Sequence, residues 1–131
     1  MKPSETKVLV VDDDKRICAF VCKMLNSAGY TSHQAAENGQ RGIEQAAAYL
    51  PHFVLMDTNM PGIDGYEACR QLRETEYGQK MAIVGMSIWD DKGRKKARWL
   101  AAGADAFINK EELEKSLLVQ VIEETVPKYQ G

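Results

Sequence analysis

Short runs of apolar residues alternate along this chain with longer segments in which apolar residues recur every three or four positions. The short runs cover residues 8–11, 53–56, 81–87 and 106–108, and a more polar run covers 31–35. Continuous apolar runs of this length are typical of strands buried on both faces of a parallel sheet. The polar content of 31–35 predicts a strand at the edge of that sheet.

The longer segments predict helices at 15–28, 38–50, 65–74, 90–102 and 111–126. Their ends carry residues that start or stop helices. Asn38 is a suitable N-cap, and Gly29 and Gly103 suit helix C-termini. Pro51 and Pro127 end helices because proline has no main-chain N–H to donate. Since strands and helices alternate five times, we expect an α/β fold in which helices cover both faces of a parallel sheet.

The composition is that of an ordinary globular domain, with 131 residues of which 44% are hydrophobic and 27% charged. We expect a single domain over 1–131, with its core at about 7–126 and no output domain. A net charge of -2 and a pI of about 5.7 argue against broad binding to nucleic acid or membrane surfaces. No signal peptide is recognisable, and no apolar run approaches the roughly 18 residues that span a membrane, which predicts a cytoplasmic protein.

The three cysteines, Cys18, Cys22 and Cys69, cannot form a closed disulfide framework. Cys18 and Cys22 lie four positions apart on a predicted helix and so share a face. A metal site would need further ligands, and neither His33 nor His52 is placed to supply them. We therefore expect reduced cysteines packed in or beside the core.

Polar side chains stand at the ends of four of the five predicted strands: Asp12 and Asp13, Asp57, Ser87, and Lys110. If the strand order is 2-1-3-4-5, the first and third strands are neighbours and their carboxylates converge at one edge of the sheet. Carboxylates about 4 Å apart repel by roughly 4 kcal/mol per pair at an effective dielectric constant near 20. The convergence therefore predicts a bound cation, and oxygen ligands favour Mg²⁺.

A cation, an ammonium group and a hydroxyl around one carboxylate are the groups that phosphoryl transfer to that carboxylate requires. Each residue alone has an ordinary explanation. Asp13 or Asp14 alone would cap a helix, Asp57 alone would form a turn, and Lys110 alone would be a solvated lysine. Together, at matching strand ends, they predict phosphoryl transfer to Asp57.

The chain resembles the receiver domains of bacterial two-component response regulators over nearly its whole length. The matching residues are Val10 to Asp13, Asp57 with Met60 to Gly65, Ser87, Gly103-Ala104, and Phe107 with Lys110. The resemblance implies a flavodoxin-like (βα)5 fold with strand order 2-1-3-4-5. It also implies that Asp57 accepts a phosphoryl group from a histidine kinase or phosphotransfer protein. Such a domain is a signalling module, and it catalyses only its own phosphorylation and dephosphorylation.

The resemblance also implies a set of Mg²⁺ ligands. Asp13, Asp57 and the main-chain carbonyl of Asn59 would bind the ion directly, and Asp12 would assist through water. Mg²⁺ is the one cofactor that we expect.

In the same family pattern, Ser87 and Lys110 hold the phosphoryl oxygens, and Ser87 and Phe107 form the conformational switch. Three positions depart from the pattern. Phe107 has no hydroxyl, Ile88 stands where a small residue is usual and would crowd the site, and Glu111 replaces the proline that follows the lysine in many receivers. None of these departures removes a catalytic group.

Two positions are expected to set the lifetime of the phosphorylated state. In the family, the residues equivalent to Asn59 and Trp89 flank the path of the hydrolytic water. We expect the indole of Trp89 to exclude that water more strongly than the amide of Asn59 orients it. The alternative is that Trp89 points outward toward a partner.

The predicted output face consists of the helix at 90–102, the strand at 106–108 and the helix at 111–126. Five basic and two acidic residues lie within 90–98, whereas the last helix carries five glutamates and one lysine. These charges suit a symmetric homodimer in which the basic helix of one copy meets the acidic helix of the other. Leu118, Val119 and Ile122 are expected to form its apolar centre. The alternative is two solvated faces.

Two other functions are consistent with parts of the sequence. A haloacid-dehalogenase-type phosphatase would use Asp12 and Asp14 as its paired carboxylates, although Lys15 and Arg16 replace the residues expected after them, and Asp57 would have no role. A receiver-like module that binds partners without being phosphorylated is the other alternative.

Overall fold

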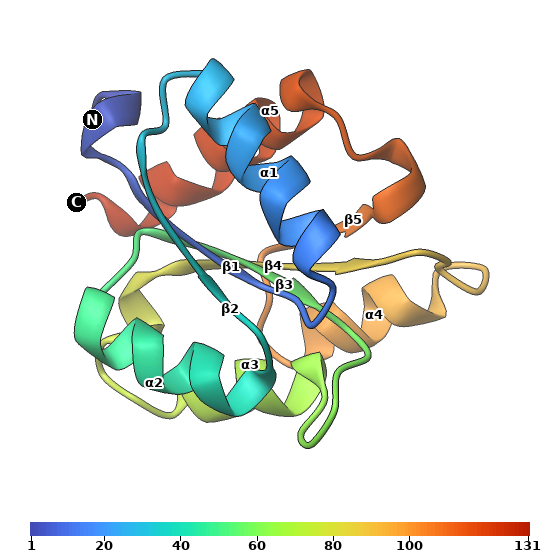
Figure 1. Cartoon of the computed structure of the whole chain (residues 1–131). Coiled ribbons are helices and arrows are strands. Elements are labelled where there is room, and N and C mark those ends of the chain that lie inside the picture. The colour runs from blue at the N-terminus through green and yellow to red at the C-terminus, as the bar shows by residue number, and fades with distance from the viewer.

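The computed structural model describes all residues, 1–131, and shows a five-stranded parallel sheet between two layers of helices (Figure 1). The strands are β1 (Lys7–Val11), β2 (Ser32–Ala36), β3 (Phe53–Asp57), β4 (Ala82–Ser87) and β5 (Ala106–Asn109). They lie in the order β2-β1-β3-β4-β5, and every pair is parallel. The predicted fold class and strand order are confirmed.

Five α-helices connect or follow the strands. They are α1 (Lys15–Ser27), α2 (Gly39–Tyr49), α3 (Gly65–Arg73), α4 (Arg94–Ala101) and α5 (Lys115–Thr125). Figure 1 shows α1 and α5 on one face of the sheet and α2, α3 and α4 on the other. None of the helices has the length and apolar character needed to cross a bilayer.

Each face of the sheet has its own apolar core, because successive side chains of a strand point to opposite faces. Val8 and Val10 of β1 belong to the cluster beneath α1 and α5, whereas Leu9 and Val11 belong to the cluster beneath α2, α3 and α4. The largest fully buried side chain is Trp99 of α4, in the second cluster. These cores fix the sheet edge on which the strand-end residues meet.

The thiols behave as the sequence predicts. All three cysteines are free, Cys18 and Cys69 are buried, and Cys22 is half-buried. Burial raises the pKa of Cys18 and of Cys69 to about 11. Neither histidine approaches them: His52 Nδ1 accepts a hydrogen bond from the main-chain N–H of Lys7.

Helix α4 begins at Arg94, four residues later than predicted. Residues 91–93 have φ values of 53°, 57° and 86°, and this left-handed backbone cannot continue a right-handed helix. The Asp90 carboxylate instead accepts a hydrogen bond from the Lys96 N–H at 2.9 Å. The prediction of a helix from residue 90 was therefore wrong at its start.

Helix α5 also begins later than predicted, at Lys115 rather than Glu111. Residues Lys110–Glu112 form a 3₁₀ turn, and the side chain of Asn109 accepts a hydrogen bond from the Glu111 N–H. Leu113 then leaves the turn in an extended conformation and is buried in the first core. All peptide bonds are trans, that between Lys110 and Glu111 included.

Candidate functional site

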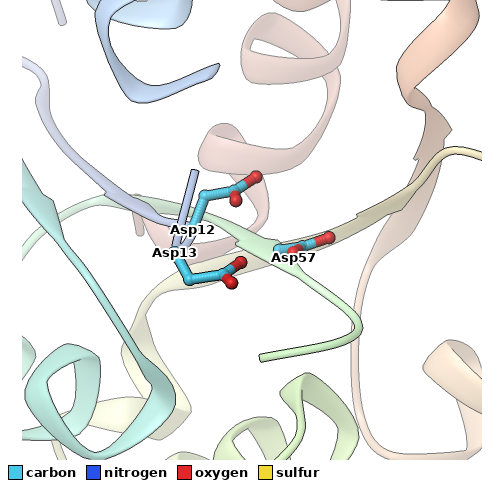
Figure 2. A group of neighbouring side chains, drawn as sticks. All are labelled: Asp12, Asp13 and Asp57. Carbon is cyan, nitrogen blue, oxygen red and sulfur yellow. The ribbon is translucent and has the colours of Figure 1, made fainter. Parts of the chain in front are cut away.

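Three carboxylates meet where β1 and β3 end (Figure 2). Val11 of β1 pairs with Met56 of β3, so Asp12 and Asp57 follow at neighbouring positions. One oxygen atom each from Asp12, Asp13 and Asp57 lies within 4.8 Å of the others. Asp12 and Asp57 are buried, whereas Asp13 is exposed at the end of the turn. The structure thus brings together the carboxylates that the sequence placed at adjacent strand ends.

Lys110 completes what we call the Asp57 cluster (Asp12, Asp13, Asp57 and Lys110). Its Nζ lies 2.8 Å from Asp12 Oδ2 and 3.0 Å from Asp57 Oδ1. Burial raises the pKa of Asp57, and Lys110 only partly opposes this effect. Burial also disfavours the ammonium form of Lys110, but the two carboxylates outweigh it and raise the pKa of the lysine. Lys110 is therefore a fixed cation beside Asp57.

The donor set of this cluster fits a hard divalent cation. Its three carboxylates face only one ammonium group, and Asp12 Oδ2 is buried without a hydrogen bond of good geometry. Oxygen ligands with an excess of negative charge are those that Mg²⁺ prefers. Asn59 is exposed and lines the same pocket.

Ser87 ends β4 and is buried beside the cluster. Its Oγ accepts a hydrogen bond from Lys95 Nζ at 2.8 Å. A pocket of about 320 Å³ connects these residues, and Lys95, Lys110 and Asp57 all line it. In the sequence Lys95 is recognisable only as one of the charges of its helix, because the left-handed backbone that precedes the helix has no clear sequence signal.

Ile88 and Trp89 form the rim of this pocket. Their exposed fractions are 63% and 64%, so most of each residue is open to solvent. The Lys95 ammonium lies 5.9 Å from the centroid of the Trp89 ring. Phe107, the expected switch residue, is half-buried against the second core.

A second unpredicted contact joins α4 to the strand that carries Asp57. Thr58 Oγ1 donates a hydrogen bond to the Met86 carbonyl at 2.8 Å and accepts one from Trp99 Nε1 at 2.9 Å. The indole fits only because Gly85 has no side chain, since a Cβ there would lie 2.1 Å from the ring. Helix α4 is thus anchored one residue from Asp57.

Asp14 acts at the start of α1. Its carboxylate accepts a hydrogen bond from the Arg16 N–H at 2.9 Å and pairs with the Arg16 guanidinium at 3.3 Å. A phosphatase of the dehalogenase type would need this carboxylate as the partner of Asp12. The structure uses it as a helix cap instead.

The predicted apolar centre of a dimer was wrong for two of its three residues. Leu118 and Ile122 are 1% and 2% exposed because they pack into the first core. Val119 is partly buried against the same core. The surface of α5 therefore has no apolar stripe made of these residues.

Comparison with known proteins agrees with the geometry. Residues 8–123 match the family model for the response regulator receiver domain. The response regulator MprA of Mycolicibacterium vanbaalenii is 36% identical over 104 residues, which cover 79% of this chain and 43% of the relative. MprA of Mycobacterium leprae is 33% identical over 115 residues, covering 88% and 49%. The chain thus spans about half the length of these relatives or less.

Solved structures share the fold. A putative response regulator from Chloroflexus aurantiacus superposes with a TM-score of 0.85 at 27% identity, covering 93% of this chain and 98% of the other. The receiver domain of the sensor histidine kinase PA1611 from Pseudomonas aeruginosa, which has magnesium in its active-site cleft, gives a TM-score of 0.83 at 24% identity, with the same coverage.

Proposed function

The chain belongs to the family of response regulator receiver domains, and from this membership we propose that Asp57 accepts a phosphoryl group from a phosphohistidine of a sensor kinase or phosphotransfer protein. The observation that carries the proposal is the position of Asp57. Its buried carboxylate lies 3.0 Å from a lysine ammonium, beside two further carboxylates and at the wall of an open pocket. These are the surroundings of an activated nucleophile rather than of a structural ion pair.

The transfer exchanges one bond for another. An oxygen of Asp57 attacks the phosphorus atom, and a P–O bond forms as the P–N bond to the histidine breaks. The electron pair of that bond remains on the ring nitrogen, and because the other ring nitrogen of the phosphohistidine carries a proton, the leaving group is neutral imidazole. Lys110 offsets negative charge on the phosphoryl oxygens, and the hydroxyl of Ser87 donates a hydrogen bond to one of them.

In this proposal Asp13, Asp57 and the carbonyl of Asn59 hold Mg²⁺, with Asp12 acting through water. When bound, the ion supplies positive charge that offsets repulsion between the carboxylates and the incoming phosphoryl oxygens. The oxygen-only donor set and the excess negative charge of the Asp57 cluster support this assignment.

Trp89 and Asn59 would set how long the phosphoryl group persists. Both line the pocket that contains Asp57. We propose that the indole at the rim hinders the approach of water, whereas the amide of Asn59 favours it. The net effect is a longer lifetime than a small polar residue at position 89 would give.

Phosphorylation would be reported by Ser87 and Phe107 to the face formed by α4, β5 and α5. A downstream protein would bind that face, and a homodimer through it stays a prediction that rests on the opposite charges of the two helices. The cytoplasmic location and the single-domain organisation over 1–131 also stay predictions. In this function the chain turns over no external substrate beyond its own phosphoryl donor.

Incubation with acetyl phosphate and Mg²⁺ followed by mass spectrometry tests the proposal. We expect one added phosphoryl group on Asp57 and none when Mg²⁺ is chelated. Sustained hydrolysis of a phosphate ester without self-labelling would favour a phosphatase instead. Absence of any labelling would favour a module that only binds partners.

A further inference from the structure

We propose that Lys95 is a second phosphate-binding lysine of this site, which holds Ser87 before phosphorylation and binds a phosphoryl oxygen afterwards. This inference rests on the proposed phosphorylation of Asp57. It assigns to α4 a residue that acts on the reacting group itself, in addition to the strand-end residues.

The contacts of Lys95 place its ammonium at the phosphoryl pocket. Nζ donates a hydrogen bond to Ser87 Oγ at 2.8 Å, and Ser87 is 3% exposed. Lys95 lines the same pocket as Asp57 and Lys110. An ammonium group has three N–H donors, and Ser87 takes one of them, so two remain for further acceptors.

No other basic side chain of α4 has such contacts. Arg94 pairs with Asp91 at 3.4 Å, outside the pocket. The guanidinium of Arg98 lies 4.1 Å from the centroid of the Tyr66 ring, and both residues line a different pocket. The direction of Lys95 is therefore particular to this residue and is not a property of a generally basic helix.

The local backbone gives no other reason for a cation at this position. Lys95 is the second residue of α4, where the helix dipole disfavours positive charge. The preceding residues 91–93 adopt left-handed backbone, which is unfavourable for each residue that is not glycine. Both the helix dipole and the left-handed backbone are thus locally unfavourable in the segment that places the Lys95 ammonium beside Ser87.

The charge of the site changes on phosphorylation in a way that Lys95 matches. Before transfer, the carboxylates of Asp12, Asp13 and Asp57 are balanced by Lys110 and one divalent cation. An acyl phosphate at Asp57 carries about one negative charge more than the carboxylate that it replaces. The ammonium of Lys95 supplies the balancing charge. Its attraction to the phosphoryl group would also draw the start of α4 toward the site.

The test compares Lys95→Gln with Lys96→Gln, a matched change at the next, exposed residue of the same helix. Calorimetric titration measures the affinity for beryllofluoride, a phosphoryl mimic, at saturating Mg²⁺, and separately the affinity for Mg²⁺ alone. We expect Lys95→Gln to weaken beryllofluoride binding about tenfold, because a charge-assisted hydrogen bond is lost. Mg²⁺ binding should be as tight as in wild type or tighter, since a nearby positive charge is removed.

The opposite responses to anion and cation separate a direct role from a folding defect, which would weaken both. Lys95→Arg keeps a cation and should retain most of the beryllofluoride affinity, and Lys96→Gln should change neither affinity. Beryllofluoride binding by Lys95→Gln within about twofold of wild type, or a parallel loss of both affinities, would overturn the proposal. If wild type binds no beryllofluoride and is not labelled by acetyl phosphate, the proposed function itself fails.

Discussion

Two clusters of charged side chains, most of them wholly or partly buried, lie at opposite ends of the parallel strands of the sheet. The Asp57 cluster lies where the strands end, and the second, the Arg73 cluster (Arg73, Asp105 and Tyr129), lies where β5 begins. Arg73 pairs with Asp105 at 3.1 Å and also donates to the main-chain carbonyls of Gly78, Met81 and Gly103. The Asp105 carboxylate further accepts hydrogen bonds from the Tyr129 hydroxyl at 2.8 Å and from the Ile83 N–H at 3.0 Å.

The difference lies in charge balance and in unused hydrogen-bonding capacity. In the Arg73 cluster one guanidinium meets one carboxylate at 3.1 Å, and the exposed ammonium of Lys128 lies 3.7 Å from the same carboxylate. The remaining donors and acceptors are neutral, so no negative charge is left unpaired, which suits a structural role that joins α3, β5 and the C-terminus. In the Asp57 cluster three carboxylates meet one ammonium, and a buried oxygen of Asp12 has no well-aligned hydrogen bond. Similar side chains thus suit a structural role where every carboxylate has a counter-charge, and the proposed reactive role where negative charge remains for a ligand to balance.

The largest expected effect is on phosphorylation. Asp57→Asn removes the nucleophilic oxygen and should abolish labelling by acetyl phosphate, as measured by intact mass. Asp64→Asn is a suitable control, because asparagine caps a helix as well as aspartate and should leave both the cap of α3 and the labelling intact. Stoichiometric labelling of Asp57→Asn would show that another residue is the acceptor.

The next largest expected effect is a loss of stability when the Arg73 cluster is disrupted. Asp105→Asn leaves the half-buried Arg73 guanidinium without its counter-charge and should lower the free energy of unfolding by about 2 kcal/mol, less than for a fully buried pair because part of the guanidinium reaches solvent. Urea denaturation followed by circular dichroism measures this change. Mg²⁺ affinity, determined on the folded variant, should remain that of wild type. A loss of less than about 0.5 kcal/mol would contradict the structural role that the comparison assigns.

At the Asp57 cluster, replacing the buried carboxylate is expected to raise stability, in contrast to the loss expected for Asp105→Asn. Burial raises the pKa of Asp57 in the folded chain, so its ionised form opposes folding at pH values above that pKa. Without Mg²⁺, Asp57→Asn should therefore raise the free energy of unfolding by about 1 kcal/mol near pH 7. The gain should shrink as the pH falls, because protonation of Asp57 stabilises wild type in the same way.

When Mg²⁺ is added to the same denaturation experiment, wild type should become more stable than Asp57→Asn. Wild type gains stability from an ion that binds only its folded state, and the variant gains less. A lower stability of Asp57→Asn in the absence of divalent cations would mean that the pair with Lys110 outweighs burial and repulsion.

The smallest expected effect concerns the lifetime of the phosphoryl group. Trp89→Glu replaces an indole at the pocket rim with a carboxylate that can orient water. Dephosphorylation should therefore become faster by roughly several-fold, a modest effect because the carboxylate only helps to position the water. Decay of purified phosphoprotein measures the rate, and Leu100→Glu, another exposed apolar residue, is the control. An unchanged or slower decay would show that Trp89 does not shield the phosphoryl group.

Sequence reasoning predicted the sheet and the strand-end residues because each buried strand is an uninterrupted apolar run that stops at a polar residue. It placed Asp12, Asp57 and Ser87 at one edge, which is where they lie. It did not predict the start of α4, since only the backbone of residues 91–93 decides it.

Contacts between side chains that lie far apart in the sequence could not be predicted either. The hydrogen bond from Trp99 to Thr58 depends on space left by Gly85, which lies in another element. Likewise, Leu118 and Ile122 look like surplus apolar residues in the sequence, and only the packing of α5 shows that the core uses them. Such pairings depend on three-dimensional distances that no local pattern specifies.

The two tryptophans also give the chain a built-in optical probe. Trp89 stands at the pocket rim and is 64% exposed, whereas Trp99 is fully buried beneath α4. A dissolved quencher such as acrylamide will therefore reach the first indole and not the second. Because Trp89 lines the pocket beside Asp57, we expect the quenchable part of the emission to change when a phosphoryl group occupies that pocket, so that phosphorylation could be followed in real time without a fluorescent label.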